Sequence, residues 1–259
     1  MNPVAFSLFG LDIRWYGIFI ATGMVVAILL SSYTSKIKKI NYDYLLNAAL
    51  IGLPCGIIGA RLYYVAFEWG YYSQHLNEIF AIRNGGLAIH GGLLFGVGAG
   101  AAYMIYKKQS ILKNLDAVVP GIILAQAIGR WGNFMNQEAH GGPVSAEFIS
   151  KFPEFIQKGM FIDGTYYHPT FLYESIWNVL VFIILMILLK KCVEDGVVAF
   201  SYIGLYSIGR FFIEGLRTDS LMILGLRTAQ IVSLVGILAW IGYLIYVYAI
   251  KKKNKRIFS

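Results

Sequence analysis

Seven apolar runs, each long enough to cross a lipid bilayer as a helix, dominate this sequence of 259 residues. A helix needs about 20 apolar residues to span the hydrocarbon core. The composition agrees, because 58% of the residues are hydrophobic and only 14% are charged, which leaves too little polar surface for a soluble domain of this size. The runs are Trp15–Tyr33, Tyr44–Phe67, Leu87–Tyr106, Ala117–Phe134, Thr170–Leu189, Val197–Ile213 and Ala229–Ile250.

These continuous runs exclude a transmembrane β-barrel, whose strands alternate apolar and polar residues over about ten positions. We therefore predict an all-α polytopic membrane protein with seven transmembrane helices, organised as one transmembrane domain over residues 1–259. The interval 135–169 contains glycine, proline and charged residues, and we expect it to form a small extracytoplasmic cap between the fourth and fifth helices. Met1–Ile13 lacks the features of a cleavable signal peptide, so we expect the first helix to be retained. The positions of the two cysteines, Cys55 and Cys192, do not favour a disulfide.

Lysines indicate how the helices are oriented in the membrane. Clusters follow the first, third, fifth and seventh apolar runs, so with seven crossings all four fall on one side. Because lysines and arginines concentrate in cytoplasmic loops, the pattern predicts a cytoplasmic C-terminus and an N-terminus outside. The clusters are Lys36, Lys38 and Lys39; Lys107, Lys108 and Lys113; Lys190 and Lys191; and Lys251, Lys252, Lys253, Lys255 and Arg256.

The other arginines avoid these lysine clusters. The formal charge of +8 does not indicate nucleic-acid binding, because its distribution follows the membrane topology. A guanidinium presents paired donors that fit a phosphate or a carboxylate, whereas an ammonium acts as a point charge. Arginines toward the opposite ends of the helices therefore need another explanation. They are Arg14, Arg61, Arg83, Arg130, Arg210, Arg217 and Arg227.

Five of the predicted helices bring ionisable or hydrogen-bonding side chains to the outer end of the bundle. Charged groups inside a membrane are costly and usually face a cavity or one another. Their convergence at one depth predicts a site for an anionic lipid headgroup near the outer leaflet. The residues are Arg14 and Tyr16 from the first helix, His90 from the third, Arg130, Asn133, Asn136 and Glu138 from the fourth, His168, Tyr173 and Glu174 from the fifth, and Arg210, Glu214 and Arg217 from the sixth.

Structural roles would also account for some of these residues. Arg130 could anchor a helix end by extending its charge to the interface. Arg210 and Glu214 are four residues apart and could form an ion pair within one helix. His90 lies between pairs of glycines and could be a hydrogen-bonded core histidine, and Tyr16 could belong to the interfacial aromatic belt.

Glycines in the third predicted helix favour close helix packing over phosphate binding. No HExxH or CxxC spacing indicates a metal site, and no GxSxG motif indicates a serine hydrolase. We therefore expect neither a metal nor a cofactor. The glycines are Gly91, Gly92, Gly96, Gly98 and Gly100.

The sequence GRWGNFMNQEAHGG at residues 129–142 resembles the signature of bacterial phosphatidylglycerol–prolipoprotein diacylglyceryl transferases. Further matches extend the resemblance over the whole chain. This family consists of seven-span inner-membrane enzymes with the orientation that the lysines predict. The further matches are IRWYG at 13–17, IHGG at 89–92, HPTFLYE at 168–174 and GRFFIEGLRTD at 209–219.

The resemblance implies transfer of the sn-1,2-diacylglyceryl group from phosphatidylglycerol to the lipobox cysteine of a preprolipoprotein signal peptide. Glycerol 1-phosphate is released, and the product is a thioether, in the first step of bacterial lipoprotein maturation. The residues it implies are, for catalysis, Tyr16, His90 (as a base), Arg130, Arg210 and Glu214, and, for phosphatidylglycerol binding, Arg130, Asn133, Asn136, Glu138, Gly141, Glu174, Tyr206 and Arg217.

Thioether formation by this route needs a thiolate, a carbon electrophile and a stabilised phosphate leaving group. Arg130 and Arg210 would neutralise the charge that grows on the departing phosphate. A free thiol has a pKa of about 8.5 and is only slightly ionised at neutral pH. Either His90 accepts the thiol proton, or the arginine-rich surroundings lower the pKa of the thiol.

Two other classes of function fit the sequence less well. A transporter or flippase would be expected to carry polar groups at the midplane and an internal repeat, whereas here the charges lie toward one end and the chain shows no repeat. A purely structural membrane protein leaves the costly non-cytoplasmic arginines unexplained. The sequence therefore favours a membrane-embedded enzyme.

Overall fold

The computed structural model describes residues 1–82, 85–192, 194–218, 220–223 and 225–251. In these ranges seven helices are long and apolar enough to cross a membrane, which confirms the predicted all-α, seven-span fold. Arg83, Asp219, Lys252, Lys253, Lys255 and Arg256 lie outside the described residues. The seven helices are α1 (Trp15–Lys38), α2 (Tyr42–Phe67), α4 (Ile89–Tyr106), α5 (Ile111–Asn136), α8 (Thr170–Lys191), α9 (Val197–Glu214) and α10 (Thr228–Ile245), the last continued by a π-helical turn, η3 (Tyr246–Lys251).

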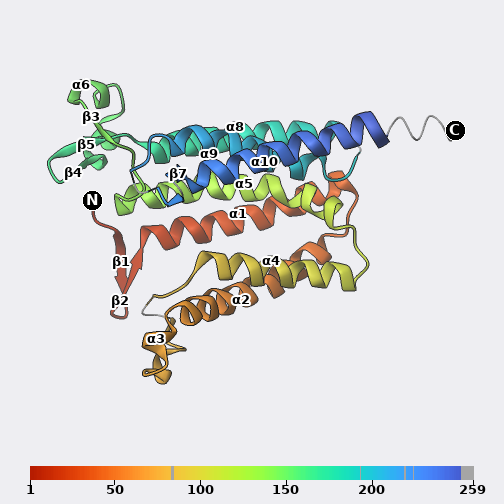
Figure 1. Cartoon of the computed structure of the whole chain (residues 1–259), viewed down its shortest axis with the longest axis horizontal. Helices are drawn as coiled ribbons and strands as arrows, with labels where there is room; N and C mark the ends of the chain where they lie inside the picture. The colour runs from red at the N-terminus through yellow and green to blue at the C-terminus, as the bar shows by residue number, and fades with distance from the viewer. Residues whose placement is uncertain (83–84, 193, 219, 224, 252–259) are drawn as a thin grey trace. The chain divides into compact units, whose positions relative to one another are not determined.

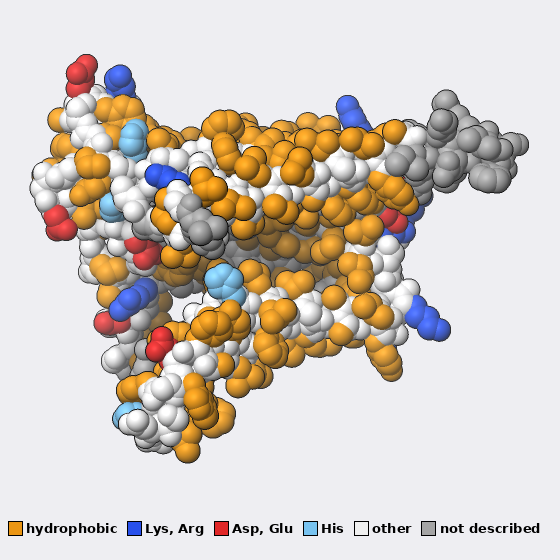
Figure 2. Space-filling view, in the orientation of Figure 1, with side chains coloured by type: hydrophobic (Ala, Val, Ile, Leu, Met, Phe, Trp, Pro, Cys, Tyr) orange, Lys and Arg blue, Asp and Glu red, His pale blue; other side chains and the backbone are white. Residues whose placement is uncertain are grey.

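The surface of these helices is apolar, as expected for a multi-pass membrane protein. Hydrophobic side chains cover the helices along their length on the face drawn in Figure 2, and charged side chains gather toward helix ends. Large hydrophobic residues such as Leu29, Leu94 and Leu238 are 65%, 66% and 68% exposed. Lipid tails would cover such residues, because hydrocarbon is as apolar as leucine.

The chain forms two compact units: unit 1 contains residues 1–38 and 115 onward, and unit 2 contains residues 39–114. In unit 2 the helices α2 and α4 pack closely, with α3 (Trp69–Tyr72) and the 3-10 helix η1 (Leu76–Glu78) between them in sequence. Glycines permit the approach: a Cβ on Gly52 would lie 2.9 Å from the carbonyl oxygen of Gly96, and a Cβ on Gly91 would collide with the backbone of Gly59. The predicted packing role is confirmed for Gly91 and Gly96. A Cβ on Gly92 or Gly100 would meet α2 at ordinary contact distance, whereas a Cβ on Gly98 would meet nothing within 4 Å, so the prediction is wrong for Gly98.

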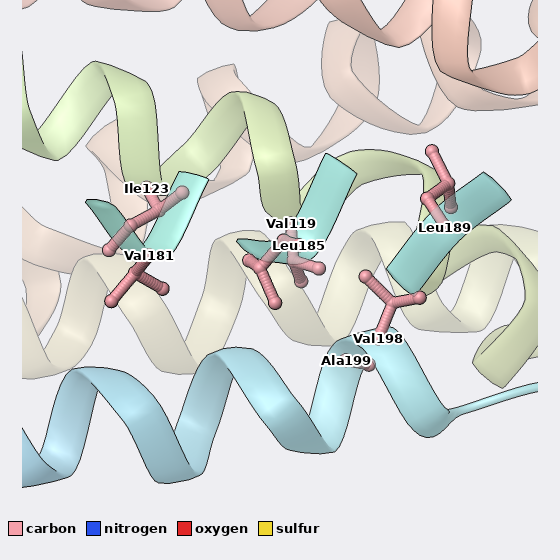
Figure 3. Packing of buried hydrophobic residues seen from close by; sticks show 7 residues of the cluster. All are labelled: Val119, Ile123, Val181, Leu185, Leu189, Val198 and Ala199. Carbon is pink, nitrogen blue, oxygen red and sulfur yellow. The ribbon is translucent and has the colours of Figure 1, made fainter. Parts of the chain in front are cut away.

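In unit 1, α5 packs against α1 on one side and against α8 and α9 on another. A Cβ on Gly121 of α5 would lie 2.9 Å from the carbonyl oxygen of Ala27 in α1. On the other side, buried aliphatic residues from three helices interlock (Figure 3). This core fixes the spacing of the helix ends that carry the charged residues. Its members are Val119 and Ile123 from α5, Val181, Leu185 and Leu189 from α8, and Val198 and Ala199 from α9.

Short strands and helices lie at one end of the unit 1 helices (Figure 1). The interval 135–169, predicted as a cap, contains a three-stranded sheet in the order β3-β5-β4 over an aromatic and aliphatic cluster that includes Phe134 and Phe171. The remaining elements are the hairpin β1 (Val4–Leu8) and β2 (Leu11–Arg14); β3 (Pro143–Val144), α6 (Ala146–Ile149), α7 (Glu154–Gly159), β4 (Phe161–Ile162) and β5 (Thr165–Tyr167); and the hairpin β6 (Met222–Ile223) and β7 (Leu226–Arg227).

The helices α1 and α5 are longer than the sequence predicted, because charged residues near their ends are paired inside the protein. Lys38 Nζ lies 2.9 Å from Asp116 Oδ2 and 3.1 Å from Asp195 Oδ1. Asp116 is fully buried and also accepts hydrogen bonds from the backbone N–H groups of Gly196 and Ala199. A buried carboxylate satisfied in this way lets the helices continue past the apolar runs.

Candidate active site

Glu174 of α8 lies at the centre of a cluster of arginines in unit 1. Its Oε2 is 2.7 Å from Arg130 Nη2 of α5, and its Oε1 is 3.3 Å from Arg210 Nη1 of α9 and 3.6 Å from Arg217 Nη1. The Glu174 carboxylate is buried, whereas the Arg130 and Arg210 side chains are each 21% exposed. Even with the carboxylate of Glu214, which pairs with Arg210, two carboxylates face three guanidiniums, so the cluster retains positive charge that a ligand can reach at Arg130 and Arg210.

A second carboxylate, that of Glu214, pairs with Arg210 on the side away from Glu174. Arg210 Nη2 lies 2.7 Å from Glu214 Oε2, so the ion pair within α9 that the spacing allowed is present. Arg210 nevertheless reaches Glu174 on another helix as well, which a purely intrahelical pair would not require. The backbone carbonyl of Glu214 accepts a hydrogen bond from Arg227. Together these contacts hold Arg210 between two carboxylates in a fixed orientation.

The signature residues after Arg130 form a hydrogen-bonded chain at the end of α5. Arg130 Nη1 donates to Asn133 Oδ1 at 3.3 Å. The side-chain amides of Asn133 and Asn136 donate to Glu138 Oε1 at 2.9 and 3.3 Å. The chain folds back here because Gln137 adopts a positive φ of 54°, a conformation of turns. Glu138 is therefore linked to Arg130 through Asn133.

Gly141 lies where two other segments approach its backbone. Its N–H donates to the carbonyl of His168 at 3.0 Å. A Cβ at this position would lie 2.6 Å from His168 Cβ and 3.0 Å from the carbonyl oxygen of Leu216, so only glycine fits without a shift. Gly141 thereby joins the segment after α5 to those that precede α8 and follow α9.

The two tyrosines implied as site residues lie on α1 and α9. Tyr16 is 38% exposed and stands against α5, since a Cβ on Gly132 would be 2.8 Å from its ring. This contact brings Tyr16 next to the turn of α5 that carries Arg130. Tyr206 lies one helical turn before Arg210, and its ring stacks on Tyr202 with 6.0 Å between centroids.

His90 belongs to unit 2, where it is the second residue of α4. Its side chain is exposed, so the alternative of a buried core histidine is wrong. The ring of Tyr63 is its aromatic neighbour, at 6.3 Å between centroids. Because the structure describes the two units separately, the proposed role of His90 as a base stays a prediction.

Not all the arginines belong to the charged cluster. Arg14 is exposed at the end of β2. Arg61 in unit 2 is only 7% exposed and stacks against the ring of Tyr72 at 5.1 Å. Its guanidinium donates to four backbone carbonyls, at 2.6 to 3.0 Å, and so fixes the segment between α2 and α4. The acceptors are Glu78, Ile79, Gly85 and Gly86.

Sequence reasoning missed a pair of residues that fixes α5 against α8 beside the cluster. Trp131 Nε1 donates to Ser175 Oγ at 3.2 Å, and Ser175 Oγ donates to the carbonyl of Ala127 at 3.0 Å. These residues directly follow Arg130 and Glu174 in sequence. That adjacency was the only available signal, since a tryptophan and a serine in apolar helices have no distinctive pattern.

Comparison with known proteins gives a consistent result over nearly the whole chain. The model of the family described as prolipoprotein diacylglyceryl transferase matches residues 3–246. A phosphatidylglycerol–prolipoprotein diacylglyceryl transferase of Clostridium botulinum strain Langeland is 58% identical over 256 residues, which cover 99% of this chain and 100% of that protein. The transferase of the same name from Clostridium kluyveri strain ATCC 8527 is 54% identical over 257 residues, with the same coverage of both chains. The resemblance expected from the signature is confirmed, and the chain belongs to the prolipoprotein diacylglyceryl transferase family.

Proposed function

We propose that this chain transfers the sn-1,2-diacylglyceryl group of phosphatidylglycerol to the lipobox cysteine thiol of a preprolipoprotein signal peptide. Membership of the family supports the transferase activity, and the names of the relatives give both substrates. The structural observation that carries the proposal is the arrangement of Arg130, Arg210 and Arg217 around the buried carboxylate of Glu174, with Glu214 on the other side of Arg210. It is a positively charged, partly exposed site suited to a phosphodiester.

The arginines supply what the reaction needs at the phosphate. Arg130 and Arg210 can each direct two N–H donors at phosphate oxygens, and their pairing with Glu174 fixes their orientation before the lipid arrives. Charge grows on the phosphate oxygen as its bond to carbon breaks. Donors fixed in advance at such a position are worth more than mobile donors in water, because they need not reorganise during the reaction.

The bond changes balance as follows. The thiolate sulfur attacks the glyceryl carbon that carries the phosphate, so that a C–S bond forms and the C–O bond breaks. The electron pair of the C–O bond leaves with the phosphate as glycerol 1-phosphate. The thiol proton passes to His90, or to water if the arginines lower the pKa of the thiol. Tyr16, Asn133, Asn136 and Glu138 would supply further hydrogen bonds around the headgroup.

We further propose that the site faces the outer leaflet of the bacterial cytoplasmic membrane. In unit 1, Lys36 and Lys190 lie in the last turns of α1 and α8, at the helix ends far from the arginine cluster. Lysines favour the cytoplasmic side. Cysteines introduced at Ser150 and Lys191, in a chain carrying Cys55→Ala and Cys192→Ala, test this. An impermeant maleimide should label position 150 from outside and position 191 only after permeabilisation. Labelling of both from the same side would contradict the orientation.

The activity is tested with the purified protein reconstituted in vesicles that contain phosphatidylglycerol. A peptide carrying an apolar segment and a lipobox cysteine is added, and mass spectrometry looks for the diacylglyceryl thioether while an enzymatic assay measures released glycerol phosphate. Both products should appear in equal amounts. A peptide with serine in place of cysteine and vesicles of phosphatidylcholine alone should each give neither product.

A matched variant links the activity to the site. Arg210→Gln should abolish both products, whereas Lys158→Gln, which changes an exposed residue of α7 (74% exposed), should leave them unchanged. Absence of product from the wild-type protein, when it is folded and supplied with both substrates, would contradict the proposed function.

A further inference from the structure

Trp177 of α8 lies against the part of α9 that carries Arg210. Its indole Nε1 donates to the backbone carbonyl of Leu205 at 2.9 Å. Its ring occupies the space that a side chain at Gly209 would fill, because a Cβ there would collide with the indole. Gly209 directly precedes Arg210 in sequence. A side chain of α8 therefore holds α9 immediately before the residue whose guanidinium belongs to the charged cluster.

The hydrogen bond and the glycine contact restrict two different movements of α9. A carbonyl oxygen has two lone pairs, so Leu205 can accept from the indole as well as from the helical N–H of Gly209, four residues later. This bond limits displacement of α9 along its axis. The contact of the ring with Gly209 limits rotation, because any other residue turned into that place would bring a side chain into the indole.

The same turn of α8 also carries Glu174. Glu174 and Trp177 are three residues apart and so lie on one face of the helix. Glu174 Oε1 is 3.3 Å from Arg210 Nη1, whereas Trp177 contacts Gly209. An ion pair alone could follow a moving helix, because an arginine side chain has several rotatable bonds. The indole acts on the backbone and fixes the point from which the Arg210 side chain extends.

We propose that Trp177 is a positioning residue for the transferase reaction. It fixes the backbone of α9, so that the Arg210 guanidinium is oriented toward the phosphate before the lipid arrives. The inference rests on the proposed function and adds to it a residue that acts only through Arg210. Donors fixed in advance gain their advantage because they need not move as charge develops. A looser α9 should therefore reduce turnover more than it weakens lipid binding.

Trp240 of α10 provides a matched control on the same helix. Its Nε1 donates to Ser201 Oγ at 3.1 Å, and a Cβ on Gly204 would collide with its ring. Each tryptophan thus gives α9 one indole hydrogen bond and one contact with a glycine, but Trp240 does so about one turn farther from Arg210. If Trp177 acted only through packing stability, replacing either tryptophan should have the same effect.

Trp177→Phe and Trp240→Phe each remove the indole N–H and shorten the ring. The measurement is kcat and KM for phosphatidylglycerol in detergent micelles with the lipobox peptide, together with the melting temperature. Trp177→Phe should lower kcat about tenfold, the size expected for loss of one oriented hydrogen bond, and should change KM less than about twofold because the guanidinium charges remain. Trp240→Phe should keep kcat within about twofold of the wild type, even with a similar fall in melting temperature.

A second variant at position 177 removes the hydrogen bond alone. Benzothienylalanine has the shape of tryptophan with sulfur in place of the indole N–H, so it keeps the contact with Gly209. Should Trp177→Phe fail to fold, this replacement gives the same comparison with Trp240→Phe. It should also lower kcat without a matching change in KM.

A double-mutant cycle tests the glycine contact separately from the hydrogen bond. Gly209→Ala should lower kcat about tenfold in the wild-type background, because its methyl group would displace the indole and α9 with it. In a Trp177→Ala background the space is open, so Gly209→Ala should change kcat less than about threefold further. Equal effects of Gly209→Ala in the two backgrounds would show that the contact does not act on turnover and would overturn the proposal.

The outcomes separate the positioning role from the function itself. If the wild type transfers the lipid and the two phenylalanine variants have the same kcat, Trp177 has no positioning role while the function stands. A rise in KM for phosphatidylglycerol with unchanged kcat in Trp177→Phe would also overturn the role, by assigning Trp177 to lipid binding. Absence of transfer by the folded wild type would contradict the proposed function, and with it any positioning role in that reaction.

Discussion

Arg130 and Glu174 lie on different helices, α5 and α8, and form an ion pair of 2.7 Å between Nη2 and Oε2. The other carboxylate oxygen of Glu174 faces Arg210 and Arg217. A helix anchor would extend its charge toward the interface and would need no buried carboxylate. The pair therefore favours a role for Arg130 in the site over the alternative of a snorkelling residue.

Glu174→Gln is expected to disorganise the arginines while leaving the site more positive. Phosphatidylglycerol should still be attracted, so its KM should change less than about threefold, whereas kcat should fall about a hundredfold because the donors are no longer held in place. Steady-state kinetics in the reconstituted assay measure both values. Glu154→Gln, at a 77% exposed position of the α7 ion pair, is the control, and equal kcat for the two variants would contradict an orienting role for Glu174.

The buried ion pair at the other end of the helices should control stability and not chemistry. Asp116→Ala leaves Lys38 (8% exposed) without one of its two carboxylates and leaves two backbone N–H groups without an acceptor. Breaking a buried pair in this way costs about 3–5 kcal/mol. The melting temperature in detergent should fall clearly, with little change in kcat per folded molecule, because the site lies ~21 Å away along α5.

The exposed pair between Lys158 and Glu154, 2.6 Å apart, is the control for this prediction. Exposed ion pairs contribute about 0–1 kcal/mol, so Glu154→Ala should hardly change the melting temperature. A shift for Asp116→Ala no larger than that of Glu154→Ala would show that the buried pair is not stabilising.

The seven helices could be predicted because apolar runs of this length have few other uses. Their ends could not, since the sequence shows where charges begin but not which charges are paired. Lys38 illustrates this: it belongs to a cluster that indicates topology, yet it is buried against Asp116.

The sequence predicted which residues belong to the site only in part, because it shows where charges lie but not how they are paired. Arginines toward the non-lysine ends of the helices are conspicuous, but the sequence does not distinguish Arg61, which holds backbone carbonyls in a connecting segment, from Arg130, which faces a carboxylate. Only the hydrogen-bond and ion-pair partners seen in the structure distinguish the role of Arg61 from that of Arg130. A groove beside Trp131 could not be predicted at all, because its lining, six apolar residues and Ser175, comes from three separate helices, α1, α5 and α8.

The stability of the protein should fall in mild acid because of His168. Burial lowers the pKa of His168 in the folded protein below its usual value, which is about 6.5 in an unfolded chain. As the pH falls from about 8 through 6.5, the unfolded chain takes up this proton before the folded protein does, so unfolding is favoured. The fall continues until the pH drops below the folded pKa.

The measurement is the melting temperature at pH 8 and at pH 5.5. His168→Gln can still make a hydrogen bond with the hydroxyl of Tyr173, which lies 3.3 Å from Nδ1 in the wild type, but it does not titrate. The variant should therefore show a smaller difference between the two pH values. An unchanged difference would mean that other groups cause the acid sensitivity.

Arg130→Lys separates recognition of a phosphate from anchoring of a helix. Lysine keeps the positive charge and the ability to reach the interface, so an anchor would tolerate the change. It cannot reproduce the paired donors with which a guanidinium meets both a carboxylate and a phosphate. Loss of one such contact in the transition state should cost about 3–4 kcal/mol, or roughly a hundred- to thousandfold in kcat, at saturating phosphatidylglycerol.

The matched control is Arg14→Lys, because Arg14 is exposed at the end of β2 and lies just before Tyr16. Its kcat should stay within about threefold of the wild type if ordinary surface substitutions are near neutral, and both variants should keep the wild-type melting temperature within a few degrees. Similar kcat values for Arg130→Lys and Arg14→Lys would contradict two-point binding of phosphate by Arg130, even if the transferase activity itself were demonstrated. A large loss confined to Arg130→Lys would instead locate the phosphate at the arginine that Glu174 holds in place.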